Sequence, residues 1–482
     1  MENLKEKALG YALKNAISHE GKANQGAIIA GLFAEGLKKE EVKNVMKDVS
    51  EVLKKVNSMT LEQQEKEFEK QKENLSERDT RGDEMPQLED VPKEGIVTRF
   101  SPSSSASAFH IGHIFTGMPA SIYVKKYGGK FYLRIEDTNP EKTVPECYES
   151  FPEEAKWIFG NVTEHYAQSD RMDKYYKFIE ELISKDLAFV CTCKKEDEAH
   201  AGVNSDEQKE TEFPTAREPC KCRKNSLKDN QDKWKKMLDK KGFAVGEAVL
   251  RFKSKDIKLA NPALVDFPLA RINEHKHPHV GNKYRVWPLM NLCVTYDDIE
   301  QKCTHIIRAK EHMDNAKRQE MIFDALGIKK PHTYFLGRYK FTDLEISKTK
   351  ITERIKKGEF SGWDDIRLPL ARNFKKRGYQ PAAFEGMVKR RGLSEVDKVI
   401  SQKDLFQVLN DFNRDIIRPM SVTIEYSLEK DKENKNKYTL LMDDASEKPI
   451  YTKEKLENEK IYFLKNIGFA KLNEKTLWFA HH

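Results

Sequence analysis

The sequence has no apolar run long enough to span a membrane. Its longest apolar stretch, from Gly26 to Leu37, is too short and contains Glu35. The opening residues MENLKEKALG carry charges where a secretory signal peptide has its apolar core. These absences predict a soluble, cytoplasmic protein with no membrane partner. In that reducing compartment, the seven cysteines suit metal binding better than disulfide formation.

A dinucleotide-binding fingerprint and internal repeats are also absent. No GxGxxG motif occurs, which excludes the ordinary dinucleotide site. The 482 residues are too many for one hydrophobic core, so we expect three or four domains. The 85 Lys and Arg exceed the 78 Asp and Glu, and the net charge of +7 suits an anionic partner. Alone, this excess is weak support for such a partner.

Two apolar segments separated by a helical one predict a parallel α/β unit. GIVTRF (95–100) is typical of a buried strand, and KFYLRIEDTNP (130–140) is a second strand that ends in acidic and turn residues. CTHIIRAKEH (303–312) resembles a further core strand that runs into a polar end. Ligands of such units bind at the carboxyl ends of the strands, where these polar residues lie.

Two histidines stand on either side of Gly112 in AFHIGHIFTG, at the expected start of the first helix. Imidazoles at His110 and His113 are able to donate hydrogen bonds to phosphate oxygens, with help from the helix dipole, and Gly112 would let a flat base approach the backbone. A triphosphate also needs a cation. The segment EISKTK (345–350) offers Lys348 on an expected loop, beside the hydroxyl of Ser347. A lone histidine pair or a lysine-rich loop is more often structural or solvated.

Together these motifs resemble class I aminoacyl-tRNA synthetases. HIGH (110–113) is their signature, and EISKT (345–349) is similar to a variant of their KMSKS loop. Further segments resemble those of archaeal-type glutamyl-tRNA synthetases in particular. They occur in the same order and with similar spacing, and the resemblance extends from residue 1 to about 420. These segments are VTRF (97–100), LRIEDTNP (133–140), QSDR (168–171), CTC (191–193), GEAVLR (246–251), HIIRAKEHMDN (305–315) and GEFSGWDDIRLP (358–369).

The resemblance implies a two-step ligase reaction. Glutamate and ATP with Mg²⁺ give glutamyl-adenylate, and the terminal ribose of tRNA(Glu) then takes the glutamyl group. Such chemistry needs positioning and charge compensation more than acid or base groups. His110, Gly112, His113 and Ser347 would bind ATP, and Lys348 would stabilise the leaving pyrophosphate.

The resemblance also implies an amino-acid site. Arg99 matches the family arginine that pairs with the substrate carboxylate, Glu136 matches the acidic residue that accepts its ammonium, and Arg308 matches another substrate-contacting arginine. Met290 stands where the family commonly has a tyrosine that contacts the amino acid. Methionine lacks that hydroxyl donor.

Four of the cysteines form two C-x-C pairs, which suits tetrahedral zinc. These four are Cys191, Cys193, Cys220 and Cys222. His200, between the pairs, is an alternative ligand. The metal would be structural, and the other three cysteines are expected to pack as small apolar residues.

The expected fold is α/β, with a Rossmann-like parallel catalytic sheet, an inserted acceptor-binding module, a helical domain and a small β domain. The boundaries follow composition and pattern. They are an N-terminal helical region (1–58), a charged linker (59–94), the first catalytic half (95–186), the insertion with the cysteine pairs (187–260), the second catalytic half (261–344), the KMSKS-like loop with a helical tRNA-binding domain (345–420), and a short β-rich C-terminal domain (421–482).

Three departures from the family leave alternatives open. The loop SPSSSASAFH (101–110) differs from the family's Pro/Gly-rich segment, Met290 replaces a tyrosine, and residues 421–482 are short for anticodon-binding barrels. One alternative is a paralogue that activates glutamate for another acceptor. Another is a catalytically silent tRNA-binding or assembly protein. Charging of tRNA(Gln) is a further open question, because it depends on the anticodon contacts of the short C-terminus.

Overall fold

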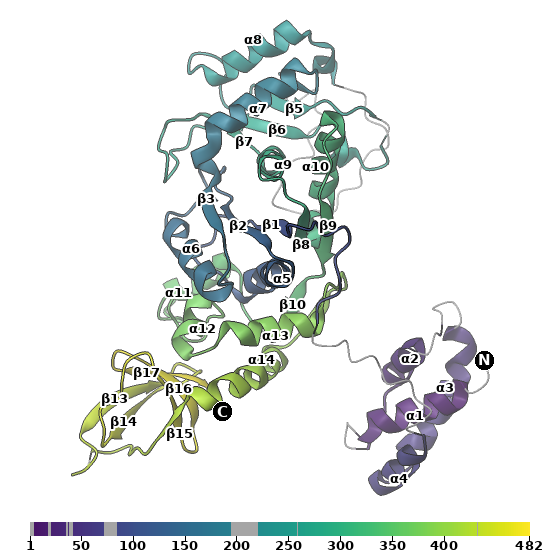
Figure 1. Cartoon of the computed structure of the whole chain (residues 1–482), viewed down its shortest axis with the longest axis vertical. Coiled ribbons are helices and arrows are strands. Elements are labelled where there is room, and N and C mark those ends of the chain that lie inside the picture. Colours follow the sequence, from purple (N-terminus) through teal and green to yellow (C-terminus); the bar gives the residue numbers. More distant parts are fainter. Residues whose placement is uncertain are drawn as a thin grey trace. The chain divides into compact units, whose positions relative to one another are not determined.

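The chain is described by a computed structural model that covers residues 4–17, 21–34, 37, 42–71, 84–193, 220–257, 259–430 and 432–482. It divides into two compact units, Met1–Glu84 and Met85–His482 (Figure 1). No helix in the described ranges is both long and apolar enough to cross a bilayer.

The first unit is a small helical bundle. It contains α1 (Leu4–Ile17), α2 (Gln25–Ala34), α3 (Val42–Asn57) and α4 (Leu61–Gln71). Helix α4 lies in the segment 59–94 that the charge pattern predicted to be a linker. The buried Gln64 explains the difference, because its amide donates to the carbonyls of Gly21 and Val56, each at 2.9 Å. These two bonds tie α4 to the rest of the bundle, which lets a helix with few apolar residues pack.

A parallel sheet forms the centre of the second unit. β1 (Ile96–Phe100), β2 (Gly129–Ile135) and β3 (Glu164–Ala167) pair in that order, and β8 (His305–Ala309) pairs with β9 (His332–Leu336). The Thr304 backbone N–H donates to the Val97 carbonyl at 2.9 Å, which sets β8 beside β1. Helices α5 (Ile111–Tyr127), α6 (Cys147–Ile158) and α10 (Met313–Leu326) connect the strands. The predicted α/β class is therefore confirmed.

An antiparallel sheet follows β3 in the chain. Its order is β4 (Ala188–Cys191), β5 (Val249–Phe252), β6 (Pro268–Ile272) and β7 (Val286–Pro288). The helices α7 (Met172–Ser184), α8 (Leu227–Leu238) and α9 (Met290–Glu300) belong to the same region (Figure 1). β6 and β7 lie beyond residue 260, where we expected the insertion to end. They continue the sheet because Ala270 pairs with Leu250, and both side chains are fully buried.

The remaining chain is helical and then β-rich. β10 (Tyr339–Phe341) pairs with β11 (Lys398–Ile400), and the helices are α11 (Lys348–Lys356), α12 (Ala371–Arg377), α13 (Pro381–Arg391) and α14 (Gln402–Ile417). A six-stranded sheet ends the chain, formed by β12 (Val422–Ile424), β13 (Asn436–Leu441), β14 (Glu447–Thr452), β15 (Ile461–Leu464), β16 (Gly468–Asn473) and β17 (Thr476–His481). The buried Arg377 joins this sheet to α12 by donating to the carbonyls of Phe479 and Ala480, at 2.9 and 2.7 Å.

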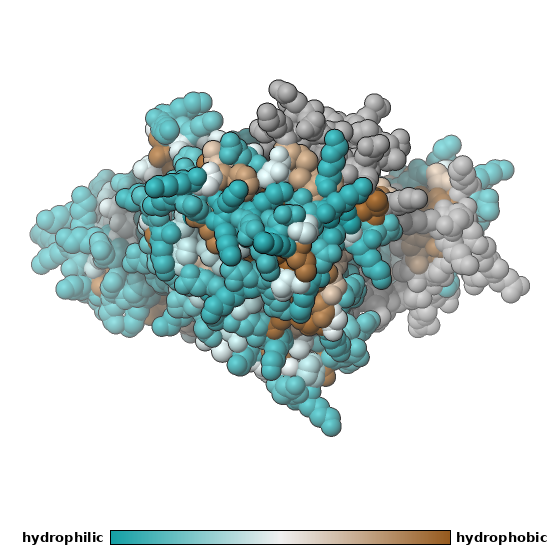
Figure 2. All heavy atoms as spheres, turned by 90° about the horizontal axis from the view of Figure 1, so that it is seen from above, coloured by the Kyte–Doolittle hydropathy of each residue, from teal (hydrophilic) through white to brown (hydrophobic). Residues whose placement is uncertain are grey.

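Short 3-10 helices complete the connections: η3 (Gln168–Arg171), η5 (Lys221–Lys224), η6 (Pro262–Leu264), η7 (Lys310–His312) and η8 (Arg418–Met420). Figure 2 views the molecule from the end at which α8 lies in Figure 1. The surface on that face is largely hydrophilic, with small separate apolar patches.

Candidate active site

The two histidines lie at the N-terminus of α5, directly after the loop that leaves β1. His110 caps the helix, and its Nδ1 accepts from the backbone N–H groups of Gly112 at 3.0 Å and His113 at 3.4 Å. His113 Nδ1 in turn accepts from the His110 backbone N–H at 3.4 Å. The rings stack with centroids 3.9 Å apart and planes 19° apart. Each imidazole thus satisfies a helix-end donor that would otherwise lack a partner.

These contacts also determine the protonation of the pair. Burial lowers the pKa of His110 to about 4, and burial together with the neighbouring His110 lowers the pKa of His113 well below its usual value. Both rings are therefore neutral at pH 7. Because each Nδ1 accepts a hydrogen bond, the proton of each neutral ring lies on Nε2. The pair offers two N–H donors beside a helix N-terminus, which suits the oxygen atoms of an anion.

Gly112 is required by the histidine ring as well as by any base stacked on the backbone. A Cβ at this position would lie 2.9 Å from His110 Cε1 and 3.0 Å from its Nδ1. A larger residue would push the ring away and break the cap. The sequence predicted that a flat base would approach the backbone at Gly112. The nearby His110 ring is a second reason for a glycine at this position.

Two residues that the sequence analysis missed hold the histidine segment in place. Glu154, in α6, accepts the backbone N–H of Phe109 at 2.5 Å and pairs with Arg372 of α12 at 3.2 Å. Arg372 also donates to the Ser107 carbonyl at 2.7 Å. Burial raises the pKa of Glu154 to about 7. The segment before His110 is thus tied to both the sheet domain and the helical region.

Lys348 reaches the same segment from the other side. Its ammonium donates to the carbonyl of Ser105, within the loop that leads to His110, at 2.5 Å. We expected a loop here, but Lys348 is the first residue of α11 and Ser347 is its N-cap. The Ser347 backbone N–H donates to Glu345 at 2.9 Å, and Lys350 lies 3.6 Å from the same carboxylate. Lys348 is exposed, and together with Arg372 it brings a cation to the loop before the histidines.

A buried charge cluster lies at the carboxyl ends of β1, β2 and β8. We call it the arginine cluster, and it consists of Arg99, Arg134, Glu136, Asp298 and Arg308. Asp298, in α9, lies 3.4 Å from Arg99 Nε and 2.5 Å from Arg134 Nη1. Burial acts to raise the pKa of Asp298, but the two guanidiniums outweigh it and hold the pKa below its usual value. Asp298 is therefore ionised and fixes two of the arginines.

Three guanidinium donors of the cluster make no hydrogen bond to the described residues, and one of them, Arg134 Nη1, lies 2.5 Å from Asp298 in an ion pair. Arg99 Nη2 and Arg308 Nε are buried and have no hydrogen-bond partner among the described residues. Burial and the nearby Arg99 lower the pKa of Arg308 to about 10, so it remains charged at pH 7. Burial raises the pKa of Glu136, and Arg99 and Arg308 oppose that rise. A buried donor without a partner is costly, and a ligand with carboxylates would satisfy these donors.

Two acidic residues at this cluster were not predicted from the sequence, namely Asp298 within it and Asp137 beside it. Asp298 has one signal, the adjacent acidic pair at 297–298 in α9. Asp137, next to Glu136, accepts from the Ser169 hydroxyl at 2.6 Å and the Tyr148 hydroxyl at 2.7 Å. Met290 is the first residue of α9, the helix that carries Asp298, and is partly buried.

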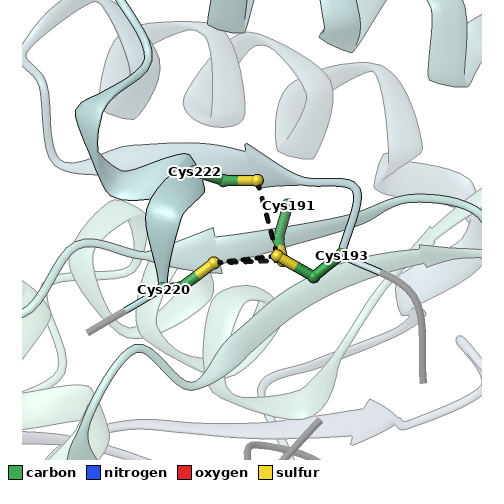
Figure 3. Close-up of side chains that lie close together, drawn as sticks. All are labelled: Cys191, Cys193, Cys220 and Cys222. Carbon is green, nitrogen blue, oxygen red and sulfur yellow. Dashed lines mark hydrogen bonds between the residues drawn. The ribbon is translucent and has the colours of Figure 1, made fainter. Parts of the chain in front are cut away.

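The four paired cysteines converge at one point (Figure 3). Cys191 ends β4 and Cys220 caps η5, and their Sγ atoms are 3.4 Å apart. Cys193 lies 3.4 Å from Cys220 and 3.7 Å from Cys222, and all four Sγ atoms lie within 4.8 Å of one another. A tetrahedral zinc ion with Zn–S bonds of 2.3 Å separates its sulfurs by about 3.8 Å. The four thiols fit such an ion, whereas His200 lies outside the described residues.

The chain is similar to known proteins over most of its length. Residues 95–415 match the family described as tRNA synthetases class I (E and Q), catalytic domain. A glutamate–tRNA ligase of Methanocaldococcus jannaschii is 35% identical over 411 residues, which cover 84% of this chain and 70% of the relative. One from Thermococcus onnurineus is 36% identical over 431 residues, or 87% and 71% of the two chains. A crystal structure of a glutamate tRNA ligase from Elizabethkingia meningosepticum aligns with a TM-score of 0.46 at 21% identity, over 67% of this chain and 70% of that one.

Proposed function

The chain belongs to the class I tRNA synthetases for glutamate and glutamine, and on this basis we propose that it is a glutamate–tRNA ligase that activates glutamate with ATP and transfers it to tRNA(Glu). The arginine cluster carries the proposal. It combines two guanidiniums that each keep one buried donor without a hydrogen-bond partner with a carboxylate, and so complements an amino acid that has two carboxylates and one ammonium.

In the proposed first step, the triphosphate of ATP lies at the N-terminus of α5. His110 and His113 donate from Nε2 to its oxygens, and Gly112 leaves the backbone open to the nucleotide. Lys348, with Ser347 beside it, neutralises the charge that develops as pyrophosphate leaves. The contact of Lys348 with the loop before His110 supports this pairing. Mg²⁺ would accompany the nucleotide and shield its phosphates.

In the same step, glutamate occupies the arginine cluster. Arg99 and Arg308 bind its carboxylates, and Glu136 accepts its ammonium. Met290 provides an apolar contact at the start of α9, where it supplies no hydroxyl. A carboxylate held beside the α-phosphate then attacks without any acid or base group, because positioning and charge compensation lower the barrier.

The other parts of the chain are proposed to bind tRNA. The sheet β4–β7 meets the acceptor end, and zinc in the four-cysteine site stiffens it without taking part in the chemistry. The helices after residue 345 bind the inside of the tRNA. Their basic residues are partly engaged within the protein, since Lys376 lies 3.2 Å from Asp364 and Lys389 lies 2.9 Å from Glu385.

The test is a pair of assays on the whole chain. ATP–pyrophosphate exchange is measured with glutamate or glutamine, with and without tRNA, and charging of tRNA(Glu) and tRNA(Gln) is measured beside it. We expect glutamate-dependent exchange and charging of tRNA(Glu). Exchange without charging of either tRNA would favour the paralogue that serves another acceptor. Neither activity, with tRNA still bound, would favour the silent binding protein.

A further inference from the structure

Arg308 differs from the other two arginines of the cluster in its partner. Arg99 and Arg134 both contact the carboxylate of Asp298. Arg308 has no carboxylate within 4.0 Å among the described residues, and instead its Nη1 donates to the amide oxygen of Gln319 at 2.9 Å. Both side chains are almost fully buried, with 6% and 5% of their surface exposed. A neutral amide therefore orients a buried cation without neutralising it.

Gln319 is itself held by a chain of neutral amides. Its Nε2 donates to Asn291 Oδ1 at 3.3 Å, and Asn291 Nδ2 donates to Asn315 Oδ1, also at 3.3 Å. Asn291 lies in α9 while Gln319 and Asn315 lie in α10, so the chain joins the two helices beside the cluster. Since an amide supplies both a donor and an acceptor, this arrangement fixes which atom of Gln319 faces Arg308.

The charges of the cluster do not balance. Asp298, whose pKa is lowered, and Glu136, whose pKa is raised by burial, oppose Arg99, Arg134 and Arg308, so that even with Glu136 ionised the cluster has three positive and two negative charges. One positive charge thus remains. The next buried carboxylate, Asp297, also acts on Arg134, but it is ion-paired with Arg171 at 2.9 Å, and counting both of these residues leaves the balance unchanged. An uncompensated buried charge is strongly unfavourable, and glutamate carries one net negative charge where glutamine carries none.

We propose that Gln319 is a positioning residue that determines the choice of glutamate over glutamine, because its neutral amide orients Arg308 and leaves the remaining positive charge for the substrate to balance. The proposal rests on the proposed function and refines it. An acidic residue at 319 would supply the missing charge from the protein, and the site would then match a neutral amino acid better.

The decisive variant is Gln319→Glu. We expect it to lower the ratio of kcat/KM for glutamate to that for glutamine by at least about tenfold, mainly through a higher KM for glutamate. Exchange is measured with tRNA present. Calorimetric titration of each amino acid into the whole protein gives the same ratio from binding alone. Lys317→Gln is the matched control, since it removes the same unit of charge from an exposed position of α10, and its ratio should equal that of the wild type.

Gln319→Met separates orientation from charge. It removes the acceptor and adds no charge, so the KM for glutamate should rise by about tenfold while the preference shifts less than in Gln319→Glu. A folded Gln319→Glu with a ratio within twofold of the wild type overturns the proposal. If that variant does not fold, a wild-type KM in Gln319→Met overturns it instead. If the wild type shows no exchange, the proposed function fails, and the titrations still decide whether Gln319 sets the preference.

Discussion

The arginine cluster and the four-cysteine site are both polar groupings inside the second unit, but they are assembled differently. The cluster draws on β1, β2, β8 and α9, whose members lie as far apart in the chain as Arg99 and Arg308. The four-cysteine site comes from two C-x-C pairs that are close to each other in sequence. The cluster holds fixed charges, whereas the thiols differ among themselves. Burial raises the pKa of Cys193 to about 11, while at Cys222 burial is outweighed by hydrogen bonds from Thr192 and the neighbouring thiols, which lower the pKa.

This difference determines what each grouping depends on. A buried charge cluster at the carboxyl ends of the central strands is stable only while each charge has its partner. Loss of one member therefore lowers the stability of the whole unit. A metal site built from neighbouring segments stabilises those segments and little else. Substitutions at the two groupings test this contrast. They also separate charges that maintain the fold from charges that act on the substrate.

The largest effect is expected for Asp298→Asn. This change leaves Arg99 and Arg134 buried without their carboxylate, and it should lower the free energy of unfolding of the second unit by about 3–5 kcal/mol. Denaturant titration followed by tryptophan fluorescence measures the loss.

Glu385→Gln is the control for this prediction. Glu385 pairs with Lys125 and Lys389 at 2.9 Å on the surface, and its loss should be much less costly. If both variants lose the same stability, the arginine cluster does not depend on paired buried charge as we describe.

The next effect is on activity. Lys348→Ala should reduce the rate of adenylate formation by about 10²–10³-fold, the usual cost of removing a charge that stabilises a leaving group. Its side chain is exposed, so stability should not change. Single-turnover exchange and thermal melting measure the two quantities.

Lys350→Ala is the matched control, because Lys350 is two residues away and only approaches Glu345, at 3.6 Å. It should keep most of the activity. Unchanged adenylate formation in Lys348→Ala, with tRNA still bound, would show that this lysine has another task.

Local patterns predicted those parts of the site whose partners are close in sequence. The histidine pair at the start of a helix and the two cysteine pairs were visible in this way, whereas Arg99 was identified only through the resemblance to the family. Strand periodicity likewise indicated the parallel sheet, because β1, β2 and β8 each contain a short apolar run. The contacts within the histidine pair lie in one turn of helix.

The missed features depend on distant partners. Nothing near Glu154 indicates that it will accept a hydrogen bond from Phe109, and nothing near Gln319 indicates that it will hold Arg308. Helix α4 was missed because its apolar content is low, and Gln64 compensates through bonds to residues elsewhere in the bundle. Pairings across tens or hundreds of residues are set by the tertiary fold, which local periodicity does not encode.

A smaller effect is expected from Glu154→Gln, through pH. Burial raises the pKa of Glu154 from 4.5 to about 7, so between these values the folded state binds more protons than the unfolded state. The contribution of this group to stability is therefore greatest below pH 4.5 and falls as pH rises through about 7. Relative to Glu154→Gln, the wild type should lose about 2 kcal/mol between pH 5 and pH 8.

Denaturant titrations of both proteins at several pH values measure this difference. The glutamine variant keeps an acceptor for the Phe109 N–H, so the segment before His110 should remain in place. A difference between the two proteins that stays constant over this range would show that Glu154 titrates normally.

The smallest and most local effect is expected from removal of the zinc proposed for the four-cysteine site. A chelator should lower the melting temperature by roughly 2–4 °C, the shift that about 1 kcal/mol produces in a domain of 150–250 residues. Since the four thiols join β4 to η5, protection of backbone amides from hydrogen exchange should fall in that sheet and persist in β1 and β2. Glutamate binding at the arginine cluster should be unchanged, whereas charging of tRNA should decline.

Cys222→Ser should reproduce the fall in melting temperature and in amide protection, and a chelator should then add nothing to either. Equal loss of protection in both sheets would mean that the four-cysteine site supports the whole unit, and the contrast with the arginine cluster would fail.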